Sequence, residues 1–241
     1  MSKHSKWAKV KNQKGATDKK RSAVFTRLAR GITVAAKAKG GDPAMNFQLR
    51  MAIDQAKDAN MPKDNIERAI KKGAGEGGEA VQYDELVYEA YGAGGTAILI
   101  EVLTDNRNRA ASEIKRVLNK HGVALGSQGA VRWMFEQKGI LQIPLGKIKN
   151  RDEIEMAAID AGAVDIKDEE DLFTIYTMPG DLEKVKVALE KSGLKIEYAG
   201  LEWVAKEKVA VGDDIRAKLE SLFEDLEENE DVNEYYTNAD L

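Results

Sequence analysis

Four glycines lie within the six residues Gly73–Gly78 and separate two parts of the chain with different residue patterns. Such a run is typical of a flexible linker, and we place a domain boundary at residue 78. Before it, apolar residues recur at spacings of three and four, which predicts helices. After it come runs rich in β-branched and aromatic residues, which predict strands. The chain therefore divides into a helical part and a mixed part.

Three short helices are predicted before the glycine run. Apolar residues recur on one face of residues 18–39, and a pair of glycines ends that helix. Asp42-Pro43 is expected to cap a second helix, which buries Met45. A third, shorter helix opens at Pro62. We therefore expect residues 1–78 to hold a basic arm and a small helical domain.

Two α+β domains are predicted after the glycine run. Residues 139–204 alternate strand, helix, strand, strand, helix, strand, which is the ferredoxin-like pattern. The segments on either side are expected to share one sheet with strands near 81–91, 96–104, 131–135 and 234–236 and helices near 106–120 and 213–228. Trp133 is expected in its core. The expected fold class is α+β, with an N-terminal three-helix domain followed by two α+β (ferredoxin-like) domains, the third inserted in the second. The expected boundaries are 1–78 for the first domain, 79–137 plus 205–241 for the second, and 138–204 for the inserted third.

Charge is distributed very unevenly along the chain. The formal net charge is −4, but residues 1–72 hold 18 Lys and Arg against 6 Asp and Glu, a net of +12. Residues 73–241 therefore carry a net of −16. A basic segment of this kind points to a polyanion partner, which the acidic remainder would repel.

The basic arm and the first helix give the strongest binding signal. Clustered cations release the counterions of a polyanion and so supply affinity that does not depend on sequence. Trp7 and His4 lie among lysines, where they are placed to stack on unpaired bases. The alternative is a solvated lysine face that only aids solubility. The candidate nucleic-acid-binding residues are Lys3, His4, Lys6, Trp7, Lys9, Lys11, Lys14, Lys19, Lys20, Arg27 and Arg30.

A second, weaker candidate is the segment Thr104–Arg109, which lies where a strand ends and a helix begins. Backbone N–H groups at a helix N-terminus, together with Arg107 and Arg109, would suit a phosphate group. Equally, Asp105 and Asn106 would cap the helix and leave both arginines exposed. The sequence leaves these two interpretations open. It shows no helix-turn-helix, zinc-finger or RRM signature, so base-specific recognition has little support.

Several classes of chemistry are excluded or disfavoured. The chain has no cysteine, which excludes disulfides, thiolate zinc sites and cysteine nucleophiles. Only His4 and His121 are present, and His121 is expected to be exposed at a helix end. Carboxylates between Asp165 and Asp171 would suit Mg²⁺ in a nuclease, but a solvated turn is favoured. We expect no catalytic residue, no metal and no cofactor. No apolar run could cross a membrane and no signal core is present, so a cytoplasmic protein is expected.

Five short motifs together resemble the YebC/PmpR family, which includes the mitochondrial translational activator of cytochrome oxidase. They are His4-Ser5-Lys6-Trp7, Gly41-Asp42-Pro43, the six residues Arg68–Gly73, the five residues Tyr88–Gly92 and the seven residues Leu103–Arg109. The resemblance implies an N-terminal helical domain and two α+β domains around a cleft. It also implies a non-enzymatic role in gene expression, either as a probable DNA-binding transcriptional regulator or as a ribosome-associated translation factor that relieves elongation stalling.

The expected function is that of a cytoplasmic, non-enzymatic, nucleic-acid-binding regulator of gene expression. The choice between DNA and ribosomal RNA stays open at this point. A protein partner is expected at the acidic domains, and no membrane contact. Two alternatives from other classes are a Mg²⁺-dependent nuclease and an interaction scaffold whose acidic C-terminal helix docks a basic partner.

Overall fold

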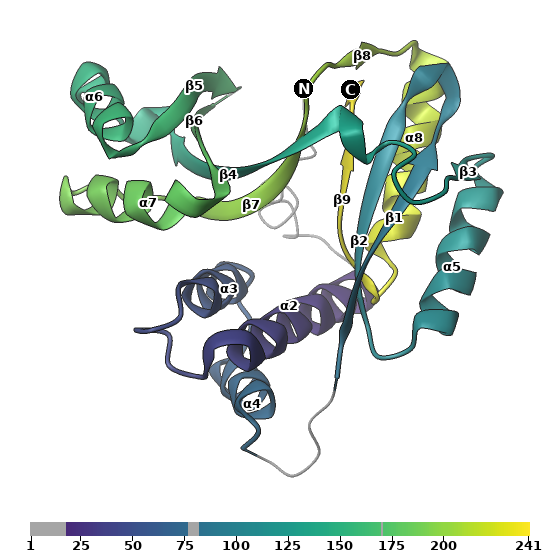
Figure 1. Ribbon diagram of the computed structural model, residues 1–241, viewed down its shortest axis with the longest axis horizontal. Helices are drawn as coiled ribbons and strands as arrows, with labels where there is room; N and C mark the ends of the chain where they lie inside the picture. Colours follow the sequence, from purple (N-terminus) through teal and green to yellow (C-terminus); the bar gives the residue numbers. More distant parts are fainter. Residues whose placement is uncertain (1–17, 77–81, 170) are drawn as a thin grey trace. The chain divides into compact units, whose positions relative to one another are not determined.

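The computed structural model describes residues 18–76, 82–169 and 171–241, which form two compact units. One unit holds residues 135–204, and the other holds the rest of the described chain. In the described residues, three helices come first and two sheet-plus-helix regions follow (Figure 1), so the predicted α+β class is confirmed. Among the helices of the described residues, none combines the length and apolar character needed to cross a bilayer.

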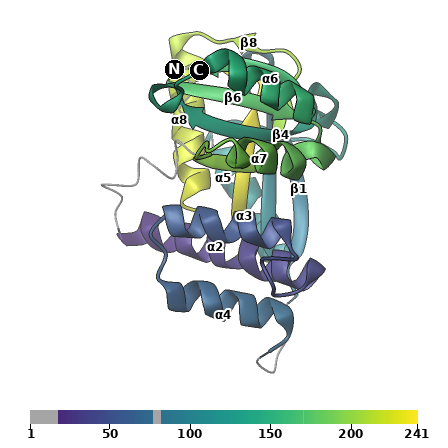
Figure 2. The same ribbon diagram turned by 90° about the vertical axis from the view of Figure 1, so that its left-hand side faces the viewer.

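The described part of the N-terminal domain consists of α2 (Asp18–Lys39), α3 (Phe47–Asp58) and α4 (Lys63–Ala74). Helix α2 lies between the other two (Figure 2). Its predicted bounds are confirmed, because Gly40 follows it with a φ of 91°, a left-handed conformation that ends helices. The apolar faces of the three helices enclose a core that includes Ile32, Leu49 and Ile66.

The start of α3 differs from the prediction. The sequence predicts a cap at Asp42-Pro43, but Asn46 is the N-cap. The Asn46 side-chain oxygen accepts a hydrogen bond from the first turn of α3, and its amide nitrogen donates to the carbonyls of Ala35 and Gly40 at 2.8 and 2.9 Å. One buried amide therefore closes the end of α2 and the start of α3. Met45, expected in the core, is 82% exposed because it lies in the turn before this cap.

Close packing of α4 on α2 depends on Gly73. A β-carbon at this position would lie 2.3 Å from the Thr33 carbonyl oxygen and 2.7 Å from the Ala36 β-carbon. The Thr33 hydroxyl also donates to the Ala69 carbonyl at 3.1 Å, so a buried hydrogen bond joins the helices. The expected linker therefore begins later than its first glycine: Gly73 belongs to α4, and Gly75, with a φ of 80°, ends that helix.

The second domain is a four-stranded sheet with two helices. Its strands and helices are β1 (Asp84–Tyr91), β2 (Ala97–Thr104), α5 (Arg107–Lys120), β3 (Ala124–Leu125), α8 (Asp213–Glu227) and β9 (Val232–Thr237). The strand order is β3-β1-β2-β9, so the C-terminal strand completes the sheet as predicted. Helices α5 and α8 cover one face (Figure 1), where Ile100, Ile114 and Phe223 are buried. Strands β8 (Val209–Ala210) and β10 (Ala239–Asp240) form a separate parallel pair.

Residues 131–135 do not form the predicted strand of this sheet. Strand β3 occupies the edge position instead, and residues 132–134 form a 3-10 turn. The backbone N–H groups of Gly129, Val131 and Arg132 donate to the Glu89 carboxylate rather than to a neighbouring strand. Trp133, expected in the core, is consequently on the surface with 64% of its area exposed.

The unit of residues 135–204 has the predicted ferredoxin-like element order. Its elements are β4 (Phe135–Pro144), α6 (Arg151–Ala161), β5 (Ala163–Glu169), β6 (Leu172–Thr177), α7 (Leu182–Lys191) and β7 (Tyr198–Ala205). The strand order is β5-β6-β4-β7, and β6 is antiparallel to both of its neighbours. Helices α6 and α7 lie side by side on the sheet (Figure 2), over a core that includes Leu141, Phe173 and Val185.

Candidate nucleic-acid interface

Exposed cations gather on α2 and α4. Because the apolar faces of these helices point into the small core, their charged side chains point outward. Two of the predicted binding residues, Lys20 and Arg27, lie half-buried on α2. Among the side chains of the two helices that the structure describes, the exposed cations are Arg21, Lys37, Lys39, Lys63, Arg68, Lys71 and Lys72. The helical domain thus presents a basic surface built on two helices that pack against each other.

A groove of about 670 Å³ lies between α2 and α4. Its floor includes the apolar side chains of Phe25, Ala29 and Ala69. No acidic residue is found among the described residues that line it. Four cations line it, namely Arg21, Arg30, Arg68 and Lys72. The charge of this groove suits a phosphate-bearing ligand.

An aromatic ring orders the cations on one side of this groove. The Lys72 ammonium lies 5.5 Å from the ring centre of Tyr83 and 3.3 Å from its hydroxyl. The Arg30 guanidinium lies 5.6 Å from the same ring centre. At the other end of the groove, the Arg21 guanidinium lies 5.4 Å from the ring centre of Phe25. Such cation–π contacts hold long side chains in place while leaving the charge available.

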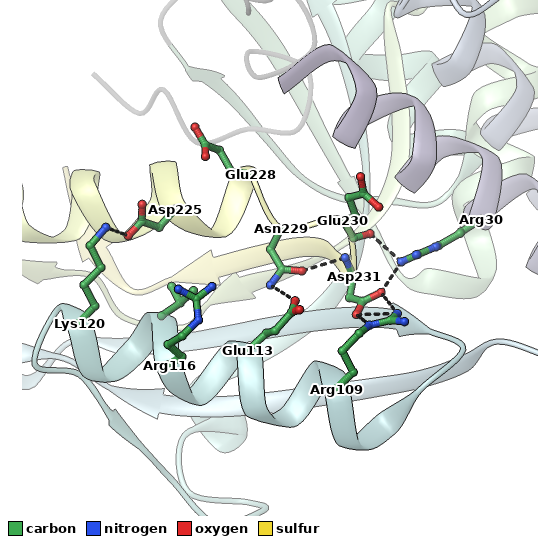
Figure 3. Close-up of a pocket in the computed structure, with 11 residues that line it drawn as sticks. Arg30, Arg109, Glu113, Arg116, Lys120, Asp225, Glu228, Asn229, Glu230 and Asp231 are labelled. Atoms are coloured by element: carbon green, nitrogen blue, oxygen red, sulfur yellow. Dashed lines mark hydrogen bonds and ion pairs between the residues drawn. The ribbon is translucent and has the colours of Figure 1, made fainter. Parts of the chain in front are cut away.

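Arg30 differs from the other cations of the groove. Its Nη1 lies 2.6 Å from Oδ1 of Asp231 and donates to the carbonyl of Glu230 (Figure 3). It also donates to the carbonyl of Leu103. Its side chain is only 11% exposed. Arg30 is one of the predicted binding residues, but its side chain does not point to solvent, because that part of α2 packs against the second domain. The guanidinium is occupied within the protein.

A second groove, of about 570 Å³, lies beside this ion pair between α5 and α8 (Figure 3). Its charges are mixed. Lys120 pairs with Asp225 at 2.6 Å, and the Asn229 amide donates to Glu113. Positive and negative side chains alternate along it, so it lacks the single sign of charge that the groove between α2 and α4 has.

The Thr104–Arg109 segment caps α5, which is one of the two interpretations left open by the sequence. The Asn106 side chain accepts a hydrogen bond from the Arg109 backbone N–H at 3.0 Å. Hydrogen bonds to Asp231 and then to Asp105 raise the pKa of the Arg109 guanidinium. Arg107 pairs with Asp84 at 3.0 Å. Both arginines are engaged inside the second domain, and the structure does not bring them together with the groove between α2 and α4.

The remaining predicted binding residues belong to the N-terminal arm. Lys3, His4, Lys6, Trp7, Lys9, Lys11 and Lys14 lie outside the described residues, as does the side chain of Lys19. Sequence reasoning missed Arg21, Arg68, Lys72 and Tyr83 as groove residues. The helical spacing of Arg68 and Lys72, four residues apart, was a usable signal for a shared face. Tyr83 gave none, because its ring meets α2 and α4 only in the folded chain.

Two of the carboxylates considered for Mg²⁺, Asp165 and Asp168, are in ion pairs. Asp168 lies 2.5 Å from Arg151, and the Lys167 ammonium lowers the pKa of Asp165 through a hydrogen bond. Glu169 accepts a hydrogen bond from the Tyr176 hydroxyl at 2.7 Å. Among the residues that the structure describes, no group of three or more His, Asp or Glu side chains is arranged to hold a metal ion.

His121 is not exposed as expected. It is the C-cap of α5, and its side chain is 9% exposed because α8 packs beside it. Its Nε2 lies 2.6 Å from Oδ2 of Asp225. Hydrogen bonds from Lys120 and then from His121 lower the pKa of the Asp225 carboxyl. His121 therefore joins α5 to α8 in this structure.

Two family models match nearly the whole chain. One, described as the TACO1/YebC protein N-terminal domain, matches residues 5–76. The other, described as the TACO1/YebC second and third domain, matches residues 83–239. The first match covers the three helices and the second covers both α+β regions. The resemblance to the YebC/PmpR family that the sequence motifs indicated is confirmed.

Similar proteins match over nearly their full length. A protein of Pseudothermotoga lettingae, named a probable transcriptional regulatory protein, is 49% identical over 241 residues, which are all of this chain and 94% of that protein. A protein of Halothermothrix orenii with the same name is 48% identical and matched over 96% of its length. The crystal structure of a conserved hypothetical protein from Aquifex aeolicus superposes with a TM-score of 0.84 at 41% identity, covering all of this chain and 95% of that one. This chain therefore belongs to the TACO1/YebC family.

Proposed function

We propose that this protein regulates gene expression by binding the phosphate backbone of nucleic acid with its N-terminal helical domain. The observation that carries the proposal is the groove between α2 and α4, which is lined by Arg21, Arg68 and Lys72 and by no acidic residue among those described. These three side chains are exposed, and none of them is needed to fill the helical core.

The distribution of charge supports the same proposal. The groove lies in the part of the chain with a net charge of +12, whereas the remainder carries −16. A polyanion is therefore attracted to the helical domain and repelled by the acidic domains. The acidic domains, and α8 in particular, suit a basic protein partner. The basic arm, from Lys3 to Lys14, would add to the attraction for nucleic acid.

Phosphate contacts of this kind position a protein on nucleic acid but carry no sequence information. We propose that the helical domain supplies such affinity through counterion release, with each neutralised phosphate adding to the salt dependence of binding. Binding without catalysis is consistent with the names of the relatives, which describe regulators and not enzymes.

Those names also favour transcription as the regulated process. We therefore propose DNA as the first ligand to test. The second candidate is structured ribosomal RNA, with a role in translation. It is favoured by the sequence of the basic arm, in which Trp7 and His4 lie among lysines and suit unpaired bases.

The test is a salt titration of binding, with a fluorescent DNA duplex and an RNA hairpin of equal length as probes. We expect the logarithm of the binding constant to fall linearly with the logarithm of salt concentration. A triple variant, Arg21→Gln, Arg68→Gln and Lys72→Gln, should lower the affinity and reduce the slope by about 0.9 for each phosphate that the protein no longer neutralises. Probe length after incubation with Mg²⁺ tests the nuclease alternative in the same samples.

The matched control is Lys184→Gln, Lys191→Gln and Lys195→Gln, which removes three exposed cations from the unit of residues 135–204. This control should bind as the unchanged protein does. Tighter binding of the duplex supports the transcriptional role, and tighter binding of the hairpin supports the translational one. Equal salt slopes for the two triple variants would contradict the proposed interface, and failure of the unchanged protein to bind either probe at low salt would contradict the function.

A further inference from the structure

The loop between β3 and β4 is held in one conformation by a single buried side chain. Glu89 on β1 is 3% exposed. Its carboxylate accepts hydrogen bonds from the backbone N–H groups of Gly129, Val131 and Arg132 at 2.6, 2.7 and 2.8 Å. Its backbone carbonyl accepts a fourth from Gly126 at 2.7 Å. Three charge-assisted bonds and one neutral bond thus fix the backbone of this loop.

This fixed loop displays two aromatic rings. The Tyr91 hydroxyl donates to the carbonyl of Ala130 at 2.6 Å, and the Trp133 indole N–H donates to the same carbonyl at 3.1 Å. Tyr91 is 44% exposed and Trp133 is 64% exposed. Because one backbone oxygen engages the polar atom of each ring, the surface that the pair offers to a ligand is mainly ring carbon. The two rings form a preorganised aromatic pair.

The surroundings of the aromatic pair are polar and include positive charge. Arg132 and Gln128, on the same loop, are exposed. Lys206 is also exposed, and its backbone N–H donates to the carbonyl of Met134, the residue after Trp133. The one carboxylate that the loop encloses, that of Glu89, is buried and hydrogen-bonded. A ligand that combines a flat apolar face with a negative charge fits this arrangement.

We propose that Tyr91 and Trp133 form a stacking platform for unpaired bases of nucleic acid. The inference rests on the proposed function and adds a second contact to it, on a domain whose net charge gives no such signal. Every base has a π-face, so the platform needs no sequence preference, in agreement with the absence of a base-reading motif. Arg132 and Lys206 would attract the phosphates next to a stacked base. A side chain of a partner protein could occupy the same two rings, so the test must distinguish that occupant from a nucleic-acid base.

Trp133 itself provides a direct probe. The double variant Trp7→Phe and Trp203→Phe leaves Trp133 as the only tryptophan. This protein is titrated with a thymidine oligonucleotide of about 12 nucleotides and, separately, with a duplex of the same length, long enough to span several stacked bases. We expect saturable quenching of the emission by the single strand and little change with the duplex, in which the bases are already stacked.

Affinity measurements on variants complete the test. Trp133→Ala should weaken binding of the single strand by about 5- to 150-fold, the range for loss of one base-stacking aromatic side chain. Trp133→Phe should retain most of the affinity, and binding of the duplex should be unchanged in both variants. The salt slope should also be unchanged, because no phosphate contact is removed. Met156→Ala, which truncates a side chain that is 66% exposed in the other unit, is the matched control.

Two results would overturn the platform: Trp133→Ala binds the single strand as tightly as the unchanged protein, or it weakens single strand and duplex equally. In either case the proposed function stands if the Arg21, Arg68 and Lys72 variant still loses affinity, so the two failures are distinguishable. If Trp133→Ala does not fold, the emission titration of the Trp133-only protein decides. Absence of quenching while the oligonucleotide is bound excludes the platform.

Discussion

Arg30 on α2 and Asp231, just before β9, form a 2.6 Å ion pair although 201 residues separate them. Arg109 approaches the same carboxylate from α5, with its Nη2 at 2.9 Å from Oδ1. Asp231 is 3% exposed, so two guanidinium groups from different parts of the chain share one buried carboxylate. The first helix is thereby attached to the second domain by a residue that its sequence pattern had assigned to ligand binding.

Removing this carboxylate should destabilise the protein strongly. Asp231→Ala leaves two arginines without their shared partner, and the loss of one side of a buried ion pair costs about 3 kcal/mol. We place the value at the low end of the range because Arg109 keeps 41% of its side chain exposed. Urea unfolding followed by circular dichroism measures the effect.

The matched control for that substitution is Asp240→Ala. Asp240 is 63% exposed and lies 3.6 Å from Lys208, which is 64% exposed, so an effect of at most about 0.5 kcal/mol is expected. Similar losses in the two variants would show that the buried pair has no special role.

Much of the fold could be predicted because its signals are local. The bounds of α2 follow from an apolar period that ends at a glycine, and those of β6 follow from a short β-branched and aromatic run. The ferredoxin-like pattern of the unit of residues 135–204 can be predicted from the order of its strands and helices along the chain alone.

The errors arise where distant residues decide the local structure. Trp133 lies in a strand-like pattern, but Glu89, more than 40 residues earlier, takes the N–H groups that a strand would need. Arg30 is indistinguishable from Arg27 in the sequence of α2, because its partner is 201 residues away. Asn46 competes with a strong capping signal at Asp42, and it prevails since its amide also closes the end of α2.

Two glycines in the helical domain should respond in opposite ways to alanine. Alanine is favoured over glycine within a helix by up to about 1 kcal/mol. At Gly31 a β-carbon meets nothing within 4 Å, so Gly31→Ala should raise the free energy of unfolding. At Gly73 a β-carbon would lie 2.3 Å from the backbone carbonyl oxygen of Thr33 on α2. Gly73→Ala must therefore push the two helices apart and should destabilise the protein by about 1–3 kcal/mol.

Thermal unfolding of the two variants shows directly whether each substitution stabilises or destabilises the protein. Because α4 forms one wall of the groove, Gly73→Ala should also weaken nucleic-acid binding, whereas Gly31→Ala should not. A stabilised Gly73→Ala protein would mean that α4 does not pack on α2 as closely as the structure shows.

Glu89 should make the loop before β4 sensitive to acid. Burial alone raises the pKa of the Glu89 carboxyl, but hydrogen bonds from the N–H groups of Gly129, Val131 and Arg132 outweigh it and lower the pKa from its ordinary 4.5. A lowered pKa in the folded state means that the charged carboxylate stabilises the fold at pH values above the pKa of this group in the unfolded chain. This contribution is lost as the pH falls through the folded value.

Glu89→Gln tests this dependence, because glutamine places an N–H₂ group against backbone donors. We expect a loss of about 1–3 kcal/mol at neutral pH, which shrinks in acid as the glutamate of the unchanged protein becomes protonated. Urea midpoints at several pH values measure it, and Trp133 emission reports on the loop. Glu85→Gln, at an exposed position on the same strand, should cause no comparable loss. If the stability difference between Glu89→Gln and the unchanged protein grew in acid, the pKa of Glu89 would be raised in the folded state and not lowered.

Tyr83 should matter for the strength of nucleic-acid binding but not for its salt dependence. The ring holds the Lys72 ammonium through a cation–π contact and the hydroxyl, so that Lys72 is already in place when a phosphate arrives. Tyr83→Ala removes both contacts and should reduce affinity about 2- to 5-fold, the equivalent of an exposed cation–π contact. Tyr83→Phe keeps the ring and should lose less. The salt slope should stay constant, since Lys72 remains charged and still neutralises a phosphate. A changed slope in Tyr83→Ala would mean that the ring determines which phosphates are contacted, and an unchanged affinity would mean that Lys72 lies outside the interface.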